Sequence, residues 1–128
     1  MNSLYGALSN TYFRYYDIRI AEAITISGQY AVRWAANNVN AYLQNILKTK
    51  KDYVIASDTD SIYVNLGDLV EKSIQGDDEK ICAFVDKVAA QKIEPLLDSC
   101  YDKLKDTVGA REQRMVMKRE IIASKMII

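Results

Sequence analysis

The sequence predicts an α+β fold in which an antiparallel hairpin packs on two long helices. Residues 53–65 contain two short runs rich in Val, Ile and Tyr around Ser-Asp-Thr-Asp-Ser, which is typical of paired strands joined by a tight turn. Apolar residues recur every three or four positions from about residue 19 to 48 and again from 81 to 104, which predicts the helices. An apolar fraction of 49% in 128 residues is enough for the core of one domain or part of one.

The first residues predict the end of a helix and the start of a longer one. Gly6 and Asn10 are expected to end the helix in which the chain opens, and Asp17 is a predicted N-cap for the next. Between them, aromatic rings surround Arg14 and can stack on bases or grip phosphate. We favour the alternative that these rings pack at the root of the following helix. They are Tyr12, Phe13, Tyr15 and Tyr16.

The segments after the hairpin predict a helical region followed by strands. Residues 67–73 are expected to form a short helix or turn, followed by a surface loop. Pro95 falls inside the second long helix and is expected to kink it, and Gly109 is expected to end it. Residues 113–128 are rich in Met, Val and Ile, which predicts one or two strands.

Charge and composition exclude several classes of site. Lys+Arg and Asp+Glu both number 17, so the chain as a whole carries no strongly basic nucleic-acid footprint. The absence of His excludes imidazole bases, Ser-His triads and His-zinc sites. Cys82 and Cys100 are expected to be buried free thiols in a reducing compartment. Without a leader or a membrane-spanning apolar run, we expect a cytoplasmic protein (in the host cell if viral) with no membrane partner.

Two carboxylates at the predicted hairpin tip form a candidate metal site. Asp58 and Asp60 are two residues apart, so in an extended chain both point to one face and Thr59 to the other. Close carboxylates repel each other unless a cation or proton intervenes, and magnesium prefers such oxygens. The alternative is a solvated turn, as most Asp-x-Asp sequences are. A calcium loop is excluded because its required oxygen, Gly and Glu would fall on Ile62, Tyr63 and Leu69.

One acid in the tail is a further candidate for this site. Glu120 lies in the predicted strand region and is the nearby acid that could join the pair as a third carboxylate. The alternative, which is more common for such a residue, is a place on the solvent-exposed face of a strand.

Two motifs in order carry a resemblance to a known family. The run Asn-Ser-Leu-Tyr-Gly at residues 2–6 precedes Asp-Thr-Asp-Ser at 58–61 by about fifty residues. Together they resemble family B DNA polymerases, and residues 13–19 with the helix after them are most similar to the replicative polymerases of T-even-type bacteriophages. The resemblance implies a partial palm domain over 1–128, with the end of a fingers helix at 1–10 and the palm at 11–128. It further implies an antiparallel palm sheet with a catalytic hairpin, in a fragment of a larger polymerase.

The resemblance also implies a reaction and its cofactor. A DNA-directed DNA polymerase acting in DNA replication transfers nucleotides from deoxynucleoside triphosphates to a primer on a template, using two Mg²⁺ ions. By analogy with the family, Asp60 would be the catalytic ligand of both ions, and Asp58 a weaker or indirect ligand. Ser57 and Thr59 would lie at the primer end of the DNA.

A second group of residues corresponds to the family's nucleotide-facing motif. Asn2 would lie near the incoming nucleotide, Tyr5 would pack against the nascent base pair, and Gly6 would let the backbone approach the template side.

The chain departs from the family pattern in ways that leave alternatives open. The family's Lys before Asn2, its first metal-binding Asp and its Lys-Lys-Arg-Tyr motif fall outside these residues, and Ala56-Ser57 replaces the usual Tyr-Gly. We therefore expect the isolated chain to be inactive and to need the remaining polymerase domains or a complementary chain. One alternative is a non-catalytic assembly subunit of a split polymerase, joined through a strand edge at 121–128. Another is a nucleotide cyclase, against which the Asn-Ser-Leu-Tyr-Gly run argues.

Overall fold

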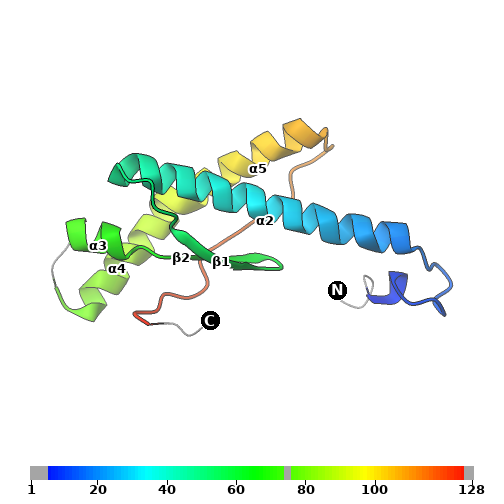
Figure 1. The fold of residues 1–128 in the computed structure, drawn as a ribbon, viewed down its shortest axis with the longest axis horizontal. Helices are drawn as coiled ribbons and strands as arrows, with labels where there is room; N and C mark the ends of the chain where they lie inside the picture. The colour runs from blue at the N-terminus through cyan, green and yellow to red at the C-terminus, as the bar shows by residue number, and fades with distance from the viewer. Residues whose placement is uncertain (1–5, 74–75, 126–128) are drawn as a thin grey trace.

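The predicted α+β class is confirmed. The computed structural model describes residues 6–73 and 76–125 of the chain. In the described part, a long helix lies across a second helical rod, and a two-stranded antiparallel sheet lies beside the C-terminal half of the first helix (Figure 1). The elements are α2 (Ile18–Leu47), β1 (Val54–Asp58), β2 (Ser61–Val64), α3 (Gly67–Ser73), α4 (Asp78–Val88), the π-helical turn η1 (Ala89–Ile93) and α5 (Glu94–Val108).

The first long helix, α2, forms where the apolar periodicity predicts it and has two unlike halves. Asp17 caps it as predicted, because its carboxylate accepts a hydrogen bond of 3.0 Å from the amide of Arg19. At about 1.5 Å per residue the helix is about 45 Å long. Its C-terminal half lies in the core, whereas its N-terminal half projects beyond the hairpin and α5 (Figure 1). The buried residues of α2 are Ala21, Ala31, Val32, Ala35, Val39, Leu43 and Leu47.

The second long helix is interrupted where Pro95 predicts a disturbance. In η1 the amide of Glu94 donates to the carbonyl of Ala89, five residues back instead of four. Proline has no N–H, and its ring clashes with the carbonyl four residues earlier in a regular α-helix. A single wider turn just before the proline accommodates both constraints. The helix then ends at Gly109, as predicted, in the left-handed conformation with a φ of 65°.

The core lies between the C-terminal half of α2, the hairpin and α5. Val39 and Leu43 of α2 belong to the same buried cluster as Leu97 and Leu104 of α5. A polar contact also ties the two helices, because the indole Nε1 of Trp34 donates to the carbonyl of residue 100 at 3.0 Å. Val54 and Ile62 of the hairpin pack against this cluster, so the hairpin rests on the two packed helices.

The prediction of strands in the tail is wrong for its described part, residues 113–125. These residues form neither strand nor helix. A strand needs a partner for its backbone amides, and in the described residues β1 pairs with β2 alone. Side chains hold the tail instead: Met117 packs against the core, and Arg119 contacts Asp86 of α4 at 2.5 Å. The amide of Arg119 also donates to Glu94 at 3.2 Å.

The aromatic segment before α2 does not pack as we expected. Tyr12 is 97% exposed, and Tyr15 and Tyr16 are also exposed, so for these three rings the prediction of packing at the root of α2 is wrong. Phe13 is half-buried and meets Tyr15 edge to face at 5.9 Å, and the guanidinium of Arg14 lies 5.5 Å from the centre of the Tyr15 ring. Phe13 and Tyr15 thus pack on each other, at an end of α2 that lies away from the core.

Two smaller predictions also need correction. Gly6 lies within a helical stretch that continues to residue 8, so it does not end that helix, whereas Asn10 lies beyond it. Cys82 is exposed, and Cys100 alone of the two free thiols is buried. Burial raises the pKa of the Cys100 thiol. Among the described residues, no helix is both long enough and apolar enough to cross a membrane.

The division of α2 into packed and exposed positions is testable. Leu43→Ala should lower the free energy of unfolding by about 2–5 kcal/mol, because it leaves a cavity where the side chain is 1% exposed. Ile46→Ala, on the exposed side of the same helix, should change it by no more than about 0.5–1 kcal/mol. Urea unfolding followed by circular dichroism measures both. Equal losses would mean that the core does not lie on this face of α2.

Candidate functional site

The Asp-Thr-Asp-Ser hairpin forms as the sequence predicts. Asp58 is the last residue of β1 and lies opposite Ser61 of β2, which leaves Thr59 and Asp60 as a two-residue turn. Alternate residues share a face only in an extended chain. Asp58 is in a strand but Asp60 is in the turn, so this rule does not place the two carboxylates. The structure therefore brings both acids to one tip through the turn rather than through the strand period.

The turn holds an unusual backbone conformation. Thr59 has a φ of 30°, a region that a β-branched residue rarely adopts. Its hydroxyl donates to the carboxylate of Asp58 at 3.0 Å, and the hydroxyl of Ser61 donates to the carbonyl of Asp58 at 3.2 Å. Strained backbone of this kind concentrates at functional sites. Through the hydrogen bond of its hydroxyl, Thr59 orients one oxygen of the Asp58 carboxylate.

The exposed carboxylates fit a hard cation that keeps part of its water. Asp58 and Asp60 are both exposed, as are Ser57 and Thr59 beside them. Magnesium usually binds through one or two carboxylates together with waters and substrate phosphates, and this tip offers two carboxylates. Within residues 6–73 and 76–125, no three acidic or thiol side chains come together as a metal site. Glu120, exposed in the tail, therefore does not complete a three-carboxylate cluster with this pair.

The base of the hairpin is held by a residue that the sequence did not single out. The side-chain oxygen of Asn40, on α2, accepts hydrogen bonds from the amides of Tyr53 and Val54, both at 2.8 Å. The carbonyl of Tyr53 accepts a hydrogen bond of 2.7 Å from the amide of Asn65, which joins the two ends of the hairpin at its base. The sequence offered one signal for Asn40: it is a poor helix former, and it lies next to Val39, which is buried.

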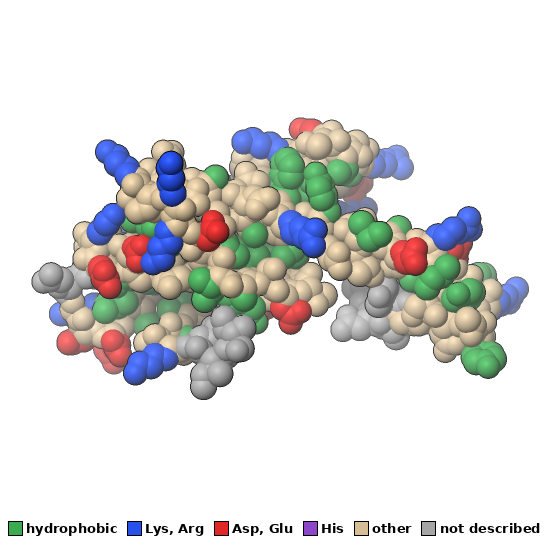
Figure 2. Space-filling model, viewed as in Figure 1, with side chains coloured by type: hydrophobic (Ala, Val, Ile, Leu, Met, Phe, Trp, Pro, Cys, Tyr) green, Lys and Arg blue, Asp and Glu red, His purple; other side chains and the backbone are tan. Residues whose placement is uncertain are grey.

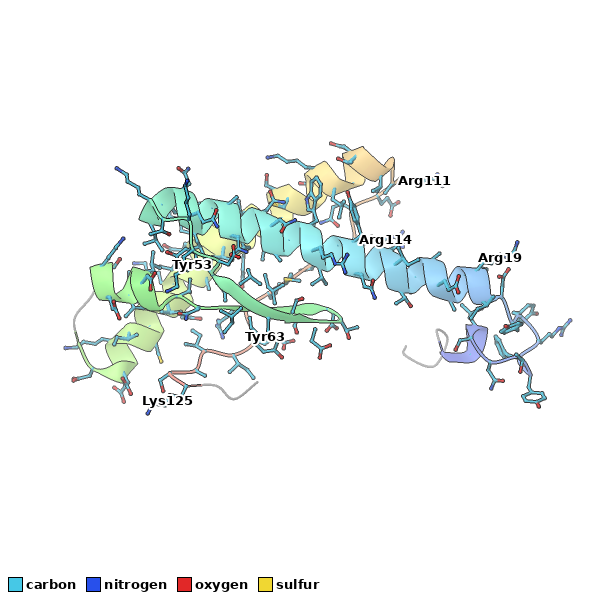
Figure 3. The ribbon with its side chains drawn as sticks, in the orientation of Figure 1. Arg19, Tyr53, Tyr63, Arg111, Arg114 and Lys125 are labelled. Carbon is cyan, nitrogen blue, oxygen red and sulfur yellow. The ribbon has the colours of Figure 1, made fainter. Side chains whose placement is uncertain are left out.

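The side chain of Tyr53 provides a second anchor at the base of the hairpin. The Tyr53 ring is 1% exposed, and its hydroxyl lies 2.7 Å from that of Thr49 and donates to Asp68 at 3.3 Å. Figure 3 shows Tyr53 between the end of α2 and α3. Lys51 pairs with Asp68 at 3.0 Å, and this hydrogen bond lowers the pKa of the Asp68 carboxyl and raises the pKa of the Lys51 ammonium.

The nucleotide-facing residues implied by the resemblance are only partly described. Asn2 and Tyr5 lie outside the described residues. Gly6 is exposed in a helical stretch, and a Cβ added there would meet no atom within 4 Å. The chain itself therefore does not require glycine at this position, and the close approach of its backbone to a template stays a prediction.

A separate surface feature lies on the projecting half of α2. A shallow groove of about 670 Å³ is lined there by Ile20, Ile24, Gly28 and Met115, among others. The space-filling view shows hydrophobic side chains on this part of the surface (Figure 2). Exposed apolar surface that gathers in one place is typical of a contact with further protein. The exposed large apolar residues of this half are Ile18, Ile20, Ile24, Ile26 and Tyr30.

Comparison with known proteins supports the polymerase resemblance. The chain is 41% identical over 127 residues to the DNA-directed DNA polymerase of Enterobacteria phage T4, covering 96% of this chain. It is 39% identical over 127 residues to the DNA-directed DNA polymerase of Escherichia phage RB69, again covering 96% of this chain. No family model matches the chain. The chain is therefore similar, along nearly its whole length, to a segment of T-even-type phage polymerases, and it spans 14% of the length of each.

The ion pair beneath the hairpin predicts a dependence of stability on pH. Because the pKa of Asp68 is lowered in the folded chain, the pair's contribution is present above the ordinary carboxyl pKa and is lost as the pH falls through the lowered value. Asp68→Asn should remove this part of the loss of stability at acid pH, because the variant has no ion pair to lose. Thermal unfolding between about pH 6 and about pH 2 measures it.

A matched variant controls for the general effect of removing a carboxylate. Asp102→Asn, at an exposed position of α5, should keep the acid profile of the unaltered chain. If Asp68→Asn has the same profile as the unaltered chain, the Lys51–Asp68 pair contributes nothing to the stability of the folded state.

Proposed function

We propose that this chain is part of the catalytic palm of a DNA-directed DNA polymerase that acts in DNA replication. The observation that carries the proposal is the exposed Asp58/Asp60 tip, held on a packed base, in a chain similar over 96% of its length to two phage DNA polymerases. Because the chain spans 14% of those relatives, the activity belongs to a complete polypeptide that includes it.

The proposed reaction extends a primer by one nucleotide. The 3′-hydroxyl oxygen of the primer forms a bond to the α-phosphorus of a deoxynucleoside triphosphate while the bond to pyrophosphate breaks, and the hydroxyl proton is released to solvent. Mg²⁺ ions, when bound at this tip, would supply charge that neutralises the oxygens of the reacting groups. Asp60 would be the main residue that holds the metal, and Asp58 would be a weaker or indirect ligand. Thr59 keeps the Asp58 carboxylate oriented through its 3.0 Å hydrogen bond.

The substrates would meet this chain at two places. Ser57 and Thr59 are exposed beside the acidic tip, which supports contact with the primer end of primer–template DNA. Asn2, Tyr5 and Gly6 would face the incoming deoxynucleoside triphosphate, as the family resemblance implies. The chain has zero net charge, so we expect the rest of the polypeptide to add cationic surface for the DNA backbone.

A second candidate is a non-catalytic assembly subunit that completes a split polymerase. The apolar groove on the projecting half of α2 favours a contact with remaining polymerase domains or with a complementary chain. The strand edge that we expected to make this contact is not a strand in residues 121–125. The Asp58/Asp60 pair separates the two candidates, since an assembly subunit has no need of these carboxylates.

Substitution of the proposed metal ligand tests the catalytic role. In the complete polypeptide, Asp60→Ala should reduce nucleotide incorporation by at least about a thousandfold, because the ligand shared by both ions is lost, while primer–template binding stays near normal. Single-turnover incorporation and a DNA-binding titration measure the two effects. Asp98→Ala, an exposed acid on α5, is the control and should keep full activity. Near-normal turnover of Asp60→Ala would refute the assignment.

The isolated chain should not extend a primer. Two carboxylates are fewer than a two-metal site usually gathers, and no described group of three acids forms in this chain. The exposed apolar residues of α2 should also make the isolated chain associate with itself. Incubation with primed template, magnesium and all four nucleotides should give no product on a sequencing gel. Extension that disappears in an Asp60→Ala control would show instead a self-sufficient catalytic unit.

A further inference from the structure

We infer that Asn40 is a positioning residue that sets the direction of the Asp58/Asp60 hairpin. Through that direction it sets how well the two carboxylates bind magnesium. The inference rests on the proposed function for its link to magnesium. Its structural part, that one side-chain oxygen fixes the base of the hairpin, stands on the contacts alone.

The contact is specific because two consecutive amides reach one oxygen. Consecutive amides of a regular strand point in opposite directions, so Tyr53 and Val54 can both donate to Asn40 only where the backbone bends. The register of the sheet shifts at this place, between Val54 and Ala56, which leaves Ile55 as an extra residue in β1. The Asn40 oxygen therefore holds the bend that starts the hairpin.

The position of the bend controls the far end of the strand. β1 runs from Val54 to Asp58, and the turn that carries Asp60 follows at once. A change of angle at Val54 is carried along the strand and displaces both carboxylates relative to the rest of a catalytic site. Asn40 sits in the packed half of α2, next to Val39, which is fully buried, so its oxygen is a fixed point.

The chain offers a matched control on the same helix. Asn38 is also half-buried, but its side-chain amide donates to the carbonyl of Trp34, one turn earlier in α2, at 2.8 Å. Asn38→Ala removes the same chemical group from the same helix without removing an acceptor from the hairpin. Asn40→Asp supplies the conservative variant, because a carboxylate oxygen can accept from both amides.

The first measurement is independent of catalysis. Hydrogen–deuterium exchange of the complete polypeptide, read in peptides that contain the amides of Tyr53 and Val54, should be roughly tenfold or more faster in Asn40→Ala. Asn40→Asp should restore protection, and Asn38→Ala should leave these amides unchanged. Unchanged exchange in a folded Asn40→Ala protein would refute the structural part of the inference.

The second measurement links the base to the metal site. The Mg²⁺ concentration for half-maximal single-turnover incorporation should rise several-fold in Asn40→Ala and return in Asn40→Asp. The single-turnover rate of Asn40→Ala should fall roughly 10- to 100-fold at low Mg²⁺. Asn38→Ala should keep the unaltered Mg²⁺ dependence. Faster exchange with an unaltered Mg²⁺ dependence would refute the positioning role and leave the proposed polymerase intact. Near-normal single-turnover incorporation by Asp60→Ala would refute the proposed function itself.

Discussion

The burial of Tyr53 is the constraint on which the arrangement of the fold depends. Its ring is fully enclosed, and its amide, carbonyl and hydroxyl each have a partner, on α2, after β2 and on α3 respectively. A buried aromatic ring with a polar tip is stable only when that tip is paired. One residue therefore fixes how the hairpin, the end of α2 and α3 meet. The acidic turn at the other end of the hairpin is left free of the core.

What the sequence predicted well was set by local chemistry. The extent of α2, the cap at Asp17 and the stop at Gly109 depend on residues within one or two turns, and the structure has each of them. The hairpin follows from β-rich runs around a short polar turn, which is also local. The exact geometry of that turn was not predictable from the strand period, because Thr59 takes a conformation that its side chain disfavours.

What the sequence did not predict depends on contacts between distant segments. Residues 113–125 have the composition of a strand, but a strand forms only against a partner, and Arg119 instead ties this segment to α4. The role of Asn40 needed knowledge of which amides come near it across 13 and 14 positions. The exposure of Tyr12 and Tyr15 likewise follows from where α2 projects, and composition does not show this.

The π-helical turn η1 affects how the continuous helical segment from α4 to α5 tolerates the insertion or deletion of a residue. A π turn is equivalent to one residue inserted into an α-helix, and each α-helical residue turns the chain by roughly 100°. The faces of α4 and α5 are therefore offset by that rotation relative to an uninterrupted helix. A homologue that lacks one residue here and has no proline at position 95 could keep a straight helix, but it would present a different side of α4 to Arg119. In relatives, we therefore expect the loss or gain of one residue in this segment to accompany the loss or gain of the proline.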